Sequence, residues 1–154
     1  MLNSKEITDW ILSKIDFEAG DTISPLKLQK LLYYCQAWHI TIFDKKIINE
    51  DFEAWAHGPV LRSVYKRFAG FHYMNESIDI NKIELQIPNI NKDSENLLLE
   101  VLSVYGNKNA SYLEKLTHSE TPWIEARGSL KEFERSDSLI SNKTIKEFYQ
   151  NLRK

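Results

Sequence analysis

The hydrophobic positions between residues 27 and 39 surround every side of a helical wheel, which is the pattern of a helix buried on all faces. No charged residue occurs from position 31 to position 43, yet the run is shorter than the roughly 20 apolar residues that a bilayer requires. The run contains Gln36 and His39, whose polar atoms need hydrogen-bond partners elsewhere in the chain. We therefore predict a central core helix, and we expect its partners in the later segments that carry tryptophan and histidine.

The start of this helix is marked by Ser24 and Pro25. A serine hydroxyl caps a first helical turn, and proline is favoured at the first helical position. We predict that the helix runs from Pro25 to about Phe43. Its expected core stripe consists of Leu28, Leu31, Leu32, Cys35, His39 and Ile42.

Helical spacing of apolar residues recurs along the rest of the chain. Asn3 and Glu6 fit a capping box, so a first helix is expected to run to about Asp16. Gly106, Asn109, the Thr121-Pro122 pair and Asn142 mark the limits of later helices. These helices are expected over about 97–105, 110–116, 121–127 and 142–152.

A third helix is predicted to begin at Pro59, after a tight backbone turn at Gly58. Gly70 is expected to end it in the left-handed conformation. Its apolar face would consist of Val60, Leu61, Val64 and Phe68.

Between residues 77 and 87 the apolar positions alternate with polar ones, which is typical of an extended segment. A small β-hairpin or a single strand fits this pattern. We find no repeat and no linker that would separate two domains. The predicted fold is an α-dominant single domain over residues 1–154, a compact multi-helix bundle around the buried central helix with a small β-hairpin near residues 77–87.

The length and charge of the chain limit its class. A chain of 154 residues can bury roughly 70% of the surface of its unfolded state in one core. The net charge is −2, so no basic field favours nucleic acid. A local basic patch at Arg62, Lys66 and Arg67 leaves DNA binding as an alternative, but a solvated helix face is favoured. The first ten residues lack the apolar core of a secretory signal, and we expect a cytoplasmic protein.

The chain offers few reactive groups. Cys35 is its one cysteine and lies on the predicted core face, which favours a buried and inert thiol. The five glycines are dispersed, so no phosphate-binding loop is present. The histidines lack the spacing of a zinc site, and we expect no metal ligand, cofactor or catalytic residue. The chain has four of them: His39, His57, His72 and His118.

Tryptophan is the most informative of the remaining residue types, because it is enriched at protein-binding surfaces. Trp38, Trp55 and Trp123 each neighbour polar residues. The alternative, which is favoured, is that all three are core residues with their indole N–H groups satisfied internally.

Three short elements follow one another along the chain. The first, over residues 27–39, contains Lys-Leu-x-Lys-Leu-Leu-Tyr-Tyr followed by Gln-Ala-Trp-His. The second is Ala-Trp-x-x-Gly-Pro-Val at residues 54–60, with a Val-Tyr pair at 64–65. The third is Thr-His-x-Glu-x-Pro-Trp at residues 117–123, with Ala-Arg at 126–127.

Together these elements resemble the SocA-like antitoxin family, the Panacea domain of phage-associated and mobile-element proteins, over roughly residues 5–130. The resemblance implies an antitoxin that neutralises a protein toxin by direct binding, with the toxin encoded by a neighbouring gene. It also implies a protease adaptor that delivers the toxin to an ATP-dependent protease. It does not imply catalysis. From charge and hydropathy we expect neither a nucleic acid nor a membrane as a partner. This chain departs from the family at residues 41–44, where a glycine is common, and at Arg62, where a proline is common, and both departures leave the partner's identity open.

Two sets of residues follow as candidates. A partner-binding surface is hypothesised to include Lys30, Tyr34 and Trp38 on one helix face, with Arg62 and Lys66, although Tyr34 and Trp38 could instead be buried under the first or last helix. A structural set, expected to lock two loops against the core helix, consists of Trp55, His57, Gly58, Pro59, His118, Glu120, Pro122, Trp123 and Arg127. The alternative function is a small-ligand-binding protein or enzyme with a site at His57, His118, Glu120 and Arg127.

Overall fold

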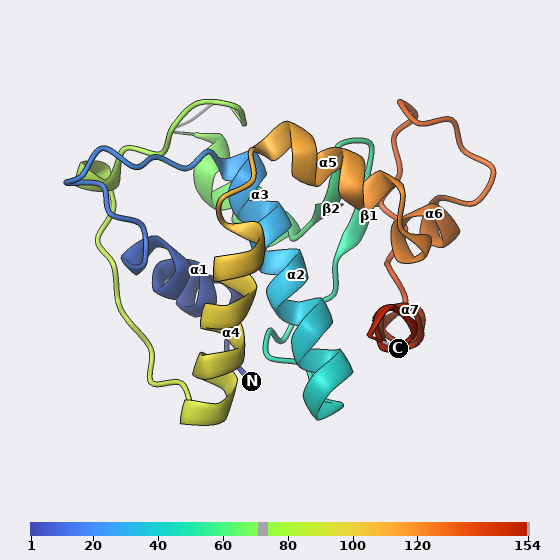
Figure 1. Ribbon diagram of the computed structural model, residues 1–154. Coiled ribbons are helices and arrows are strands. Elements are labelled where there is room, and N and C mark those ends of the chain that lie inside the picture. Colours follow the sequence, from blue (N-terminus) through green and yellow to red (C-terminus); the bar gives the residue numbers. More distant parts are fainter. Residues whose placement is uncertain (71–73, 154) are drawn as a thin grey trace.

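Helix α2 (Pro25–Phe43) runs through the middle of the molecule, and the other elements are arranged around it (Figure 1). The computed structural model describes residues 1–70 and 74–153. Within these residues the chain forms seven α-helices, a short 3-10 helix and a two-stranded antiparallel hairpin, so the predicted α-dominant bundle is confirmed. The remaining elements are α1 (Ser4–Ser13), β1 (Glu53–Trp55), β2 (Gly58–Val60), α3 (Arg62–Ala69), η1 (Ile80–Lys82), α4 (Lys92–Tyr105), α5 (Ala110–His118), α6 (Thr121–Arg127) and α7 (Asn142–Leu152).

The limits of α2 agree with the prediction. The Ser24 hydroxyl accepts a hydrogen bond from the backbone N–H of Lys27, and Pro25 occupies the first turn. Asp44 follows the helix in the left-handed conformation, with φ 57°. The predicted core stripe is buried except at its end, because the side chain of Ile42 is 37% exposed.

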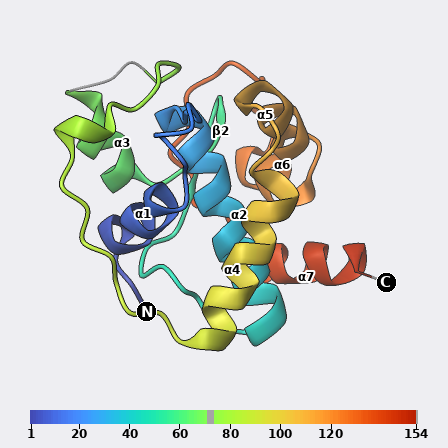
Figure 2. The ribbon, with the colours of Figure 1, turned by 60° about the vertical axis from the view of Figure 1, so that its left-hand side comes forward.

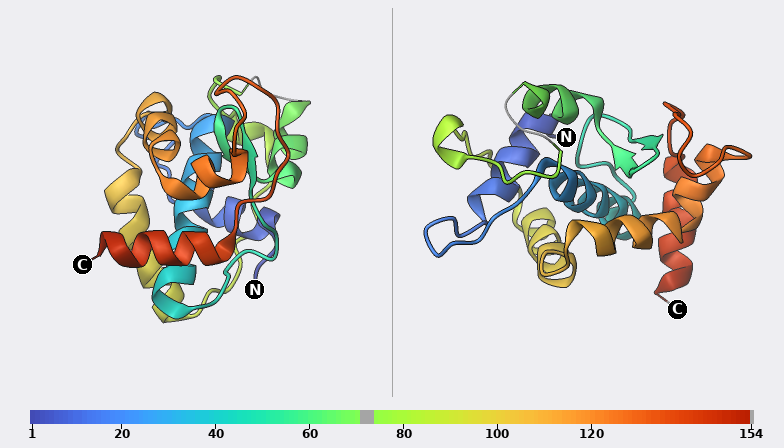
Figure 3. Two further views of the ribbon diagram at one scale, coloured as in Figure 1. Left: turned by 90° about the vertical axis from the view of Figure 1, so that its right-hand side faces the viewer. Right: turned by 90° about the horizontal axis from the view of Figure 1, so that it is seen from above.

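Helices α4 and α7 both pack against α2. Figure 3, viewed from above, shows α2 between these two helices, and Figure 2 shows α4 crossing in front of α2 with α7 behind and to the side. Helix α5, strand β2, α1 and α3 contact other parts of α2. These neighbours explain the all-round apolar pattern, because nearly every face of α2 is covered by another element.

Helix α1 begins as predicted and ends earlier. Asn3 and Glu6 form the predicted capping box, with the side chain of each accepting from the backbone N–H of the other. The helix ends at Ser13 rather than near Asp16. Its buried face, which includes Trp10, packs into the core.

The hairpin lies earlier in the chain than predicted. Strands β1 and β2 pair antiparallel with Trp55 opposite Gly58, whose φ of 114° permits the tight turn. Pro59 lies buried in β2, and the prediction that it begins the third helix is wrong. That helix, α3, begins at Arg62 and keeps the predicted buried residues Val64 and Phe68. Gly70 follows it with φ −84°, so the predicted left-handed end is also wrong.

Residues 77–87 contain the 3-10 helix η1 and extended backbone, and the structure assigns no strand to them. Their alternation arises because one side of an extended segment packs on the core, with Ile78 buried. Hydrogen bonds from this segment go to other partners. The backbone N–H of Ile78 donates to the carbonyl of Ile23, and that of Gln86 donates to the Asp9 carboxylate. The segment therefore has the side-chain pattern of a strand without a strand partner.

The later helices lie where they are predicted, but α4 begins earlier than expected and α5 ends later, at His118. Helix α4 begins at Lys92 and is followed by Gly106, Asn109 caps α5, and the Thr121-Pro122 pair begins α6. In α7 the cap is Ser141 rather than Asn142, which is the first helical residue. Among the helices of the described ranges, none combines the length and apolarity that crossing a bilayer requires.

Candidate functional site

A buried carboxylate joins the third sequence element to the core helix. Glu120 accepts a hydrogen bond of 2.7 Å from the Tyr34 hydroxyl and one of 2.8 Å from the Tyr149 hydroxyl. Tyr33 lies beside them, and its ring packs edge-on against Tyr34. Burial raises the pKa of the Glu120 carboxyl, although the two tyrosine hydrogen bonds oppose this shift. Burial likewise raises the pKa of Tyr34 and of Tyr149, so both hydroxyls stay protonated as donors. We call these four residues the Glu120–tyrosine cluster.

The cluster continues to the surface through two aromatic residues. The Tyr105 ring stacks on that of Tyr34 with a centroid distance of 4.0 Å and an interplanar angle of 7°. Trp38 donates from its indole N–H to the Tyr105 hydroxyl over 2.9 Å. Trp38 is half-buried, so an unbroken series of contacts joins a surface tryptophan to the buried Glu120.

Arg127 and Trp123 hold the hairpin against α6. Arg127 Nη1 donates to the carbonyl of Ala54 over 2.9 Å, and its Nη2 donates to carbonyls in the segment after α6. The indole N–H of Trp123 donates to the carbonyl of Trp55 over 2.9 Å. The His118 ring stacks on Trp123 with centroids 3.9 Å apart. These contacts join α6 and the segment after it to strand β1. That the structural set locks two loops against the core helix stays a prediction.

Lys30 lies beneath the hairpin turn with its side chain completely buried. Its ammonium group has no hydrogen-bond partner among the described residues. A Cβ atom added to Gly58 would lie 2.7 Å from Lys30 Cε and 3.1 Å from the Thr117 hydroxyl, so the flexible end of Lys30 would have to move. The positive φ of Gly58 is the stronger reason for glycine at this position. Burial lowers the pKa of Lys30 to about 8, and the nearby Glu114 carboxylate opposes the shift.

The other polar side chains of α2 find partners outside the predicted segments. Gln29 exchanges two hydrogen bonds with the backbone of Leu61, and Gln36 bonds to backbone groups of residues 47–50. His39 bonds to the Lys45 carbonyl and to the Ser94 hydroxyl. The expectation that tryptophan- and histidine-bearing segments supply these partners is correct for Tyr34 and wrong for Gln36 and His39.

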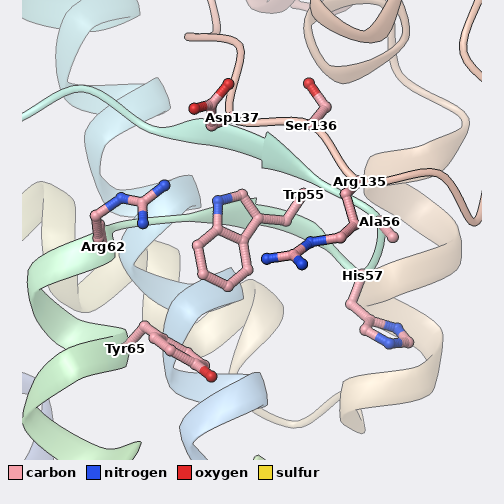
Figure 4. Close-up of a pocket in the computed structure, with 8 residues that line it drawn as sticks. All are labelled: Trp55, Ala56, His57, Arg62, Tyr65, Arg135, Ser136 and Asp137. Carbon is pink, nitrogen blue, oxygen red and sulfur yellow. The ribbon is translucent and has the colours of Figure 1, made fainter.

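A pocket of about 440 Å³ lies beside the hairpin, with Trp55 in its wall (Figure 4). Arg62 pairs with Glu53 through two hydrogen bonds and lies 5.6 Å from the Trp55 ring. In Figure 4 the side chain of Arg135 reaches toward Trp55 from the segment after α6. Tyr65 packs on Trp55 from α3, with centroids 5.0 Å apart. The tryptophan of the second element therefore lies at the surface rather than in the core.

The similarity to known proteins extends over the segment that contains the three sequence elements. The sequence model described as "Antitoxin SocA-like, Panacea domain" matches residues 28–124, from the core helix to α6. The chain belongs to this antitoxin family. A curated relative, Antitoxin SocA of Caulobacter vibrioides (strain NA1000 / CB15N), is 31% identical over 109 residues. The alignment covers 66% of this chain and 58% of the relative, so the chain spans just over half of that protein. No solved structure matches the chain.

The predicted partner surface of this antitoxin-family domain needs correction. Lys30 and Tyr34 are completely buried, so neither contributes to an exposed surface. Trp38 is half-buried, and Arg62 and Lys66 are exposed. The reason is that other elements cover α2 on nearly all sides, so even its charged residue Lys30 is buried. Partner contacts by Trp38, Arg62 and Lys66 stay a prediction.

The alternative enzyme site does not come together. His57 is exposed and pairs with Glu114, whereas His118 pairs with Glu132. Glu120 is bonded to tyrosines and Arg127 to carbonyls. Of these four residues, His118 and Arg127 line a common hollow of about 270 Å³, while His57 lines the pocket by Trp55. His57 and Glu120 do not line the hollow that His118 and Arg127 share, so the four side chains do not converge on one pocket.

Other candidate chemistry is also accounted for. Cys35 is buried as predicted, and burial raises the pKa of its thiol to about 12, which makes it a poor nucleophile. Within the described ranges, no group of three or more His, Cys, Asp or Glu side chains could hold a metal ion. His72 lies outside the described residues. Arg67 of the basic patch pairs with the buried Asp9 over 2.7 Å, so this patch presents less free charge than its sequence suggests.

Proposed function

We propose that this chain is an antitoxin that neutralises a protein toxin by direct binding. The observation that carries the proposal is the family match over residues 28–124. The geometry supports it, because Glu120, Arg127 and Gln29 use their polar groups to hold the fold together. Because these buried polar groups are used within the fold, the exposed surface is what remains to bind a protein partner.

The named relative supports the same proposal. Antitoxin SocA is similar to this chain over 109 residues. Because the alignment leaves part of the relative unmatched, the extension of an antitoxin activity to this chain is part of the proposal. The small-ligand or enzyme alternative has less support, since its four candidate side chains do not line one pocket.

The test is co-expression with the product of the neighbouring open reading frame, which we propose to be the toxin. Expression of the neighbour by itself should stop growth of the host, and co-expression of this chain should restore it. A neighbour that is harmless by itself, or that stays toxic in the presence of this chain, contradicts the proposal.

The same cells separate two modes of neutralisation. If binding by itself inhibits the toxin, immunoblots should show an unchanged toxin lifetime in rescued cells. If the chain is an adaptor for an ATP-dependent protease, the toxin should disappear faster, and deletion of that protease should abolish the rescue. The resemblance implies the second mode, and both require a direct contact between antitoxin and toxin.

A further inference from the structure

The pocket beside the hairpin has the size of a small-ligand site and an aromatic wall. Its volume is about 440 Å³, and pockets of this size commonly hold small molecules. Trp55 from β1 and Tyr65 from α3 line it, and both are only partly buried, so their rings are accessible to a ligand. A flat aromatic ring can stack on such a wall. We call this cavity the Trp55 pocket, lined by Trp55, His57, Arg62, Tyr65, Arg135 and Asp137 among others.

Two arginines line the Trp55 pocket, and they differ in what they already bind. Figure 4 shows their side chains reaching toward Trp55 from different sides. Arg62 donates two hydrogen bonds to the Glu53 carboxylate, so its charge is offset within the fold. Arg135 makes no hydrogen bond or ion pair within the described part of the chain. Its planar guanidinium group therefore has its donors free, and these match the oxygens of a carboxylate or a phosphate.

An acceptor in the same pocket narrows the class of ligand. Asp137 makes no hydrogen bond within the described ranges, and Figure 4 places its carboxylate on a different side of Trp55 from the Arg135 guanidinium. An unpaired carboxylate repels a simple anion, but it accepts hydrogen bonds from N–H groups. The ligand that suits all of these groups has a flat ring, an anionic group and N–H donors on the ring. A nucleotide with an amino group on its base combines the three.

The surroundings of the pocket favour a free nucleotide over a nucleic-acid strand. A strand follows a continuous track of cationic side chains along its phosphates. Here the net charge is −2, and the two arginines of α3 are paired, Arg62 with Glu53 and Arg67 with Asp9. Arg135 is thus an isolated free charge beside an aromatic wall, which suits one phosphate group and one base.

We propose that the Trp55 pocket binds a free mononucleotide, with the base against Trp55 and Tyr65, the phosphate on Arg135 and an N–H group of the base directed to Asp137. The inference goes beyond the proposed antitoxin function and does not rest on it. The site also differs from the enzyme alternative, because His57 is the one residue of that set that lines this pocket.

The test is titration of the purified full chain, labelled with ¹⁵N, with AMP as the probe. Loss of one indole N–H signal in Trp55→Phe identifies the Trp55 resonance. AMP should shift that resonance and leave those of Trp10 and Trp38 in place, because they bond to Glu95 and Tyr105 in other parts of the fold. Adenosine lacks the phosphate and inorganic phosphate lacks the ring, so each should bind at least about tenfold more weakly than AMP.

Arg135→Ala tests the group that carries the proposal, and it should weaken AMP binding at least about tenfold. Lys131→Ala is the matched control, because Lys131 lies in the same segment after α6, is exposed and does not line the pocket. This control should bind AMP as the wild type does. Both variants should keep the wild-type melting curve, because both side chains are exposed.

Four outcomes would overturn the inference. An unmoved Trp55 resonance in the presence of AMP would show that the pocket holds no nucleotide. Phosphate that binds as tightly as AMP would leave an anion site in which the aromatic wall has no role. Equal losses in Arg135→Ala and Lys131→Ala would mean general attraction by positive charge. Tetra-adenylate that binds at least about tenfold more tightly than AMP would make a single strand the ligand. None of these measurements involves a toxin, so the proposed function stands or fails separately.

Discussion

Two buried ionisable side chains lie about one turn apart along the core helix, and they differ in their hydrogen bonding. Glu120 bonds to the hydroxyls of Tyr34 and Tyr149, whereas Lys30 has no hydrogen-bond partner among the described residues. In both cases burial shifts the pKa toward the neutral form, upward for the carboxyl and downward for the ammonium group. Hydrogen bonds offset the cost of burying Glu120, whereas the cost of burying the Lys30 ammonium group is not offset in this way.

The largest effect is expected from Glu120→Ala, which removes the acceptor from two buried tyrosine hydroxyls and leaves a cavity. The free energy of unfolding should fall by about 5 kcal/mol. Glu120→Gln keeps an acceptor oxygen in place and should cost only about 1 kcal/mol. Urea denaturation measures both, and equal losses in the two variants would mean that the hydrogen bonds contribute little.

The pH dependence of stability offers a second measure of the same cluster. Because the pKa of Glu120 is raised in the folded state, the native protein binds more protons than the unfolded chain above pH 4.5. The free energy of unfolding should therefore fall as pH rises from about 4.5 through the raised pKa. This fall should be smaller in Glu120→Gln. Identical pH profiles would show that the carboxyl is not perturbed by burial.

The next effect concerns the turn that covers Lys30. Gly58→Ala places a side chain at φ 114° and brings a Cβ within 2.7 Å of Lys30 Cε. Backbone strain, with a smaller part from displacing the end of Lys30, should cost about 3 kcal/mol of stability. Calorimetry of the single variant and of Gly58→Ala with Lys30→Ala separates the two causes. The double variant should recover the overpacking part, and purely additive effects would attribute the whole loss to the backbone.

Lys30→Met tests whether the unpaired ammonium group destabilises the folded protein. With a folded pKa of about 8 against 10.5 in the unfolded chain, the unfolded state binds more protons between these values. Wild-type stability should therefore rise with pH across this range, by a contribution of about 3 kcal/mol. The methionine variant should lack this contribution. Denaturation at pH 7.5 and 9.5 checks the difference, and parallel curves would contradict the low pKa.

The smallest effects are expected at the exposed basic residues. Arg62→Ala and Lys66→Ala should leave the melting temperature nearly unchanged, because exposed ion pairs contribute little to stability. Their effect on toxin neutralisation, measured in the co-expression assay, tests the remaining part of the predicted partner surface. Full neutralisation by the double variant would remove these residues from that surface.

Several parts of the fold followed from local chemistry. Ser24 and Pro25 mark the start of α2, and Asn3 with Glu6 marks the start of α1, because capping requires only neighbouring residues. The hairpin at residues 53–60 was missed because strands of three residues are too short to show a period. The prediction of a helix start at Pro59 is wrong for the same reason, because a Gly-Pro pair fits a turn as well as a helix start.

The sequence by itself determined the central helix, the helical class of the fold and, through its three elements, the antitoxin family. These properties depend on periodicity, capping and motif order, which are local or colinear along the chain. Only the tertiary structure decided that Lys30 and Tyr34 are buried while Ile42 and Val104 are exposed. The reason is physical. A helix that is apolar on all sides is predicted to be buried. Which of its residues stay exposed depends on where α4, α5 and α7 pack against it.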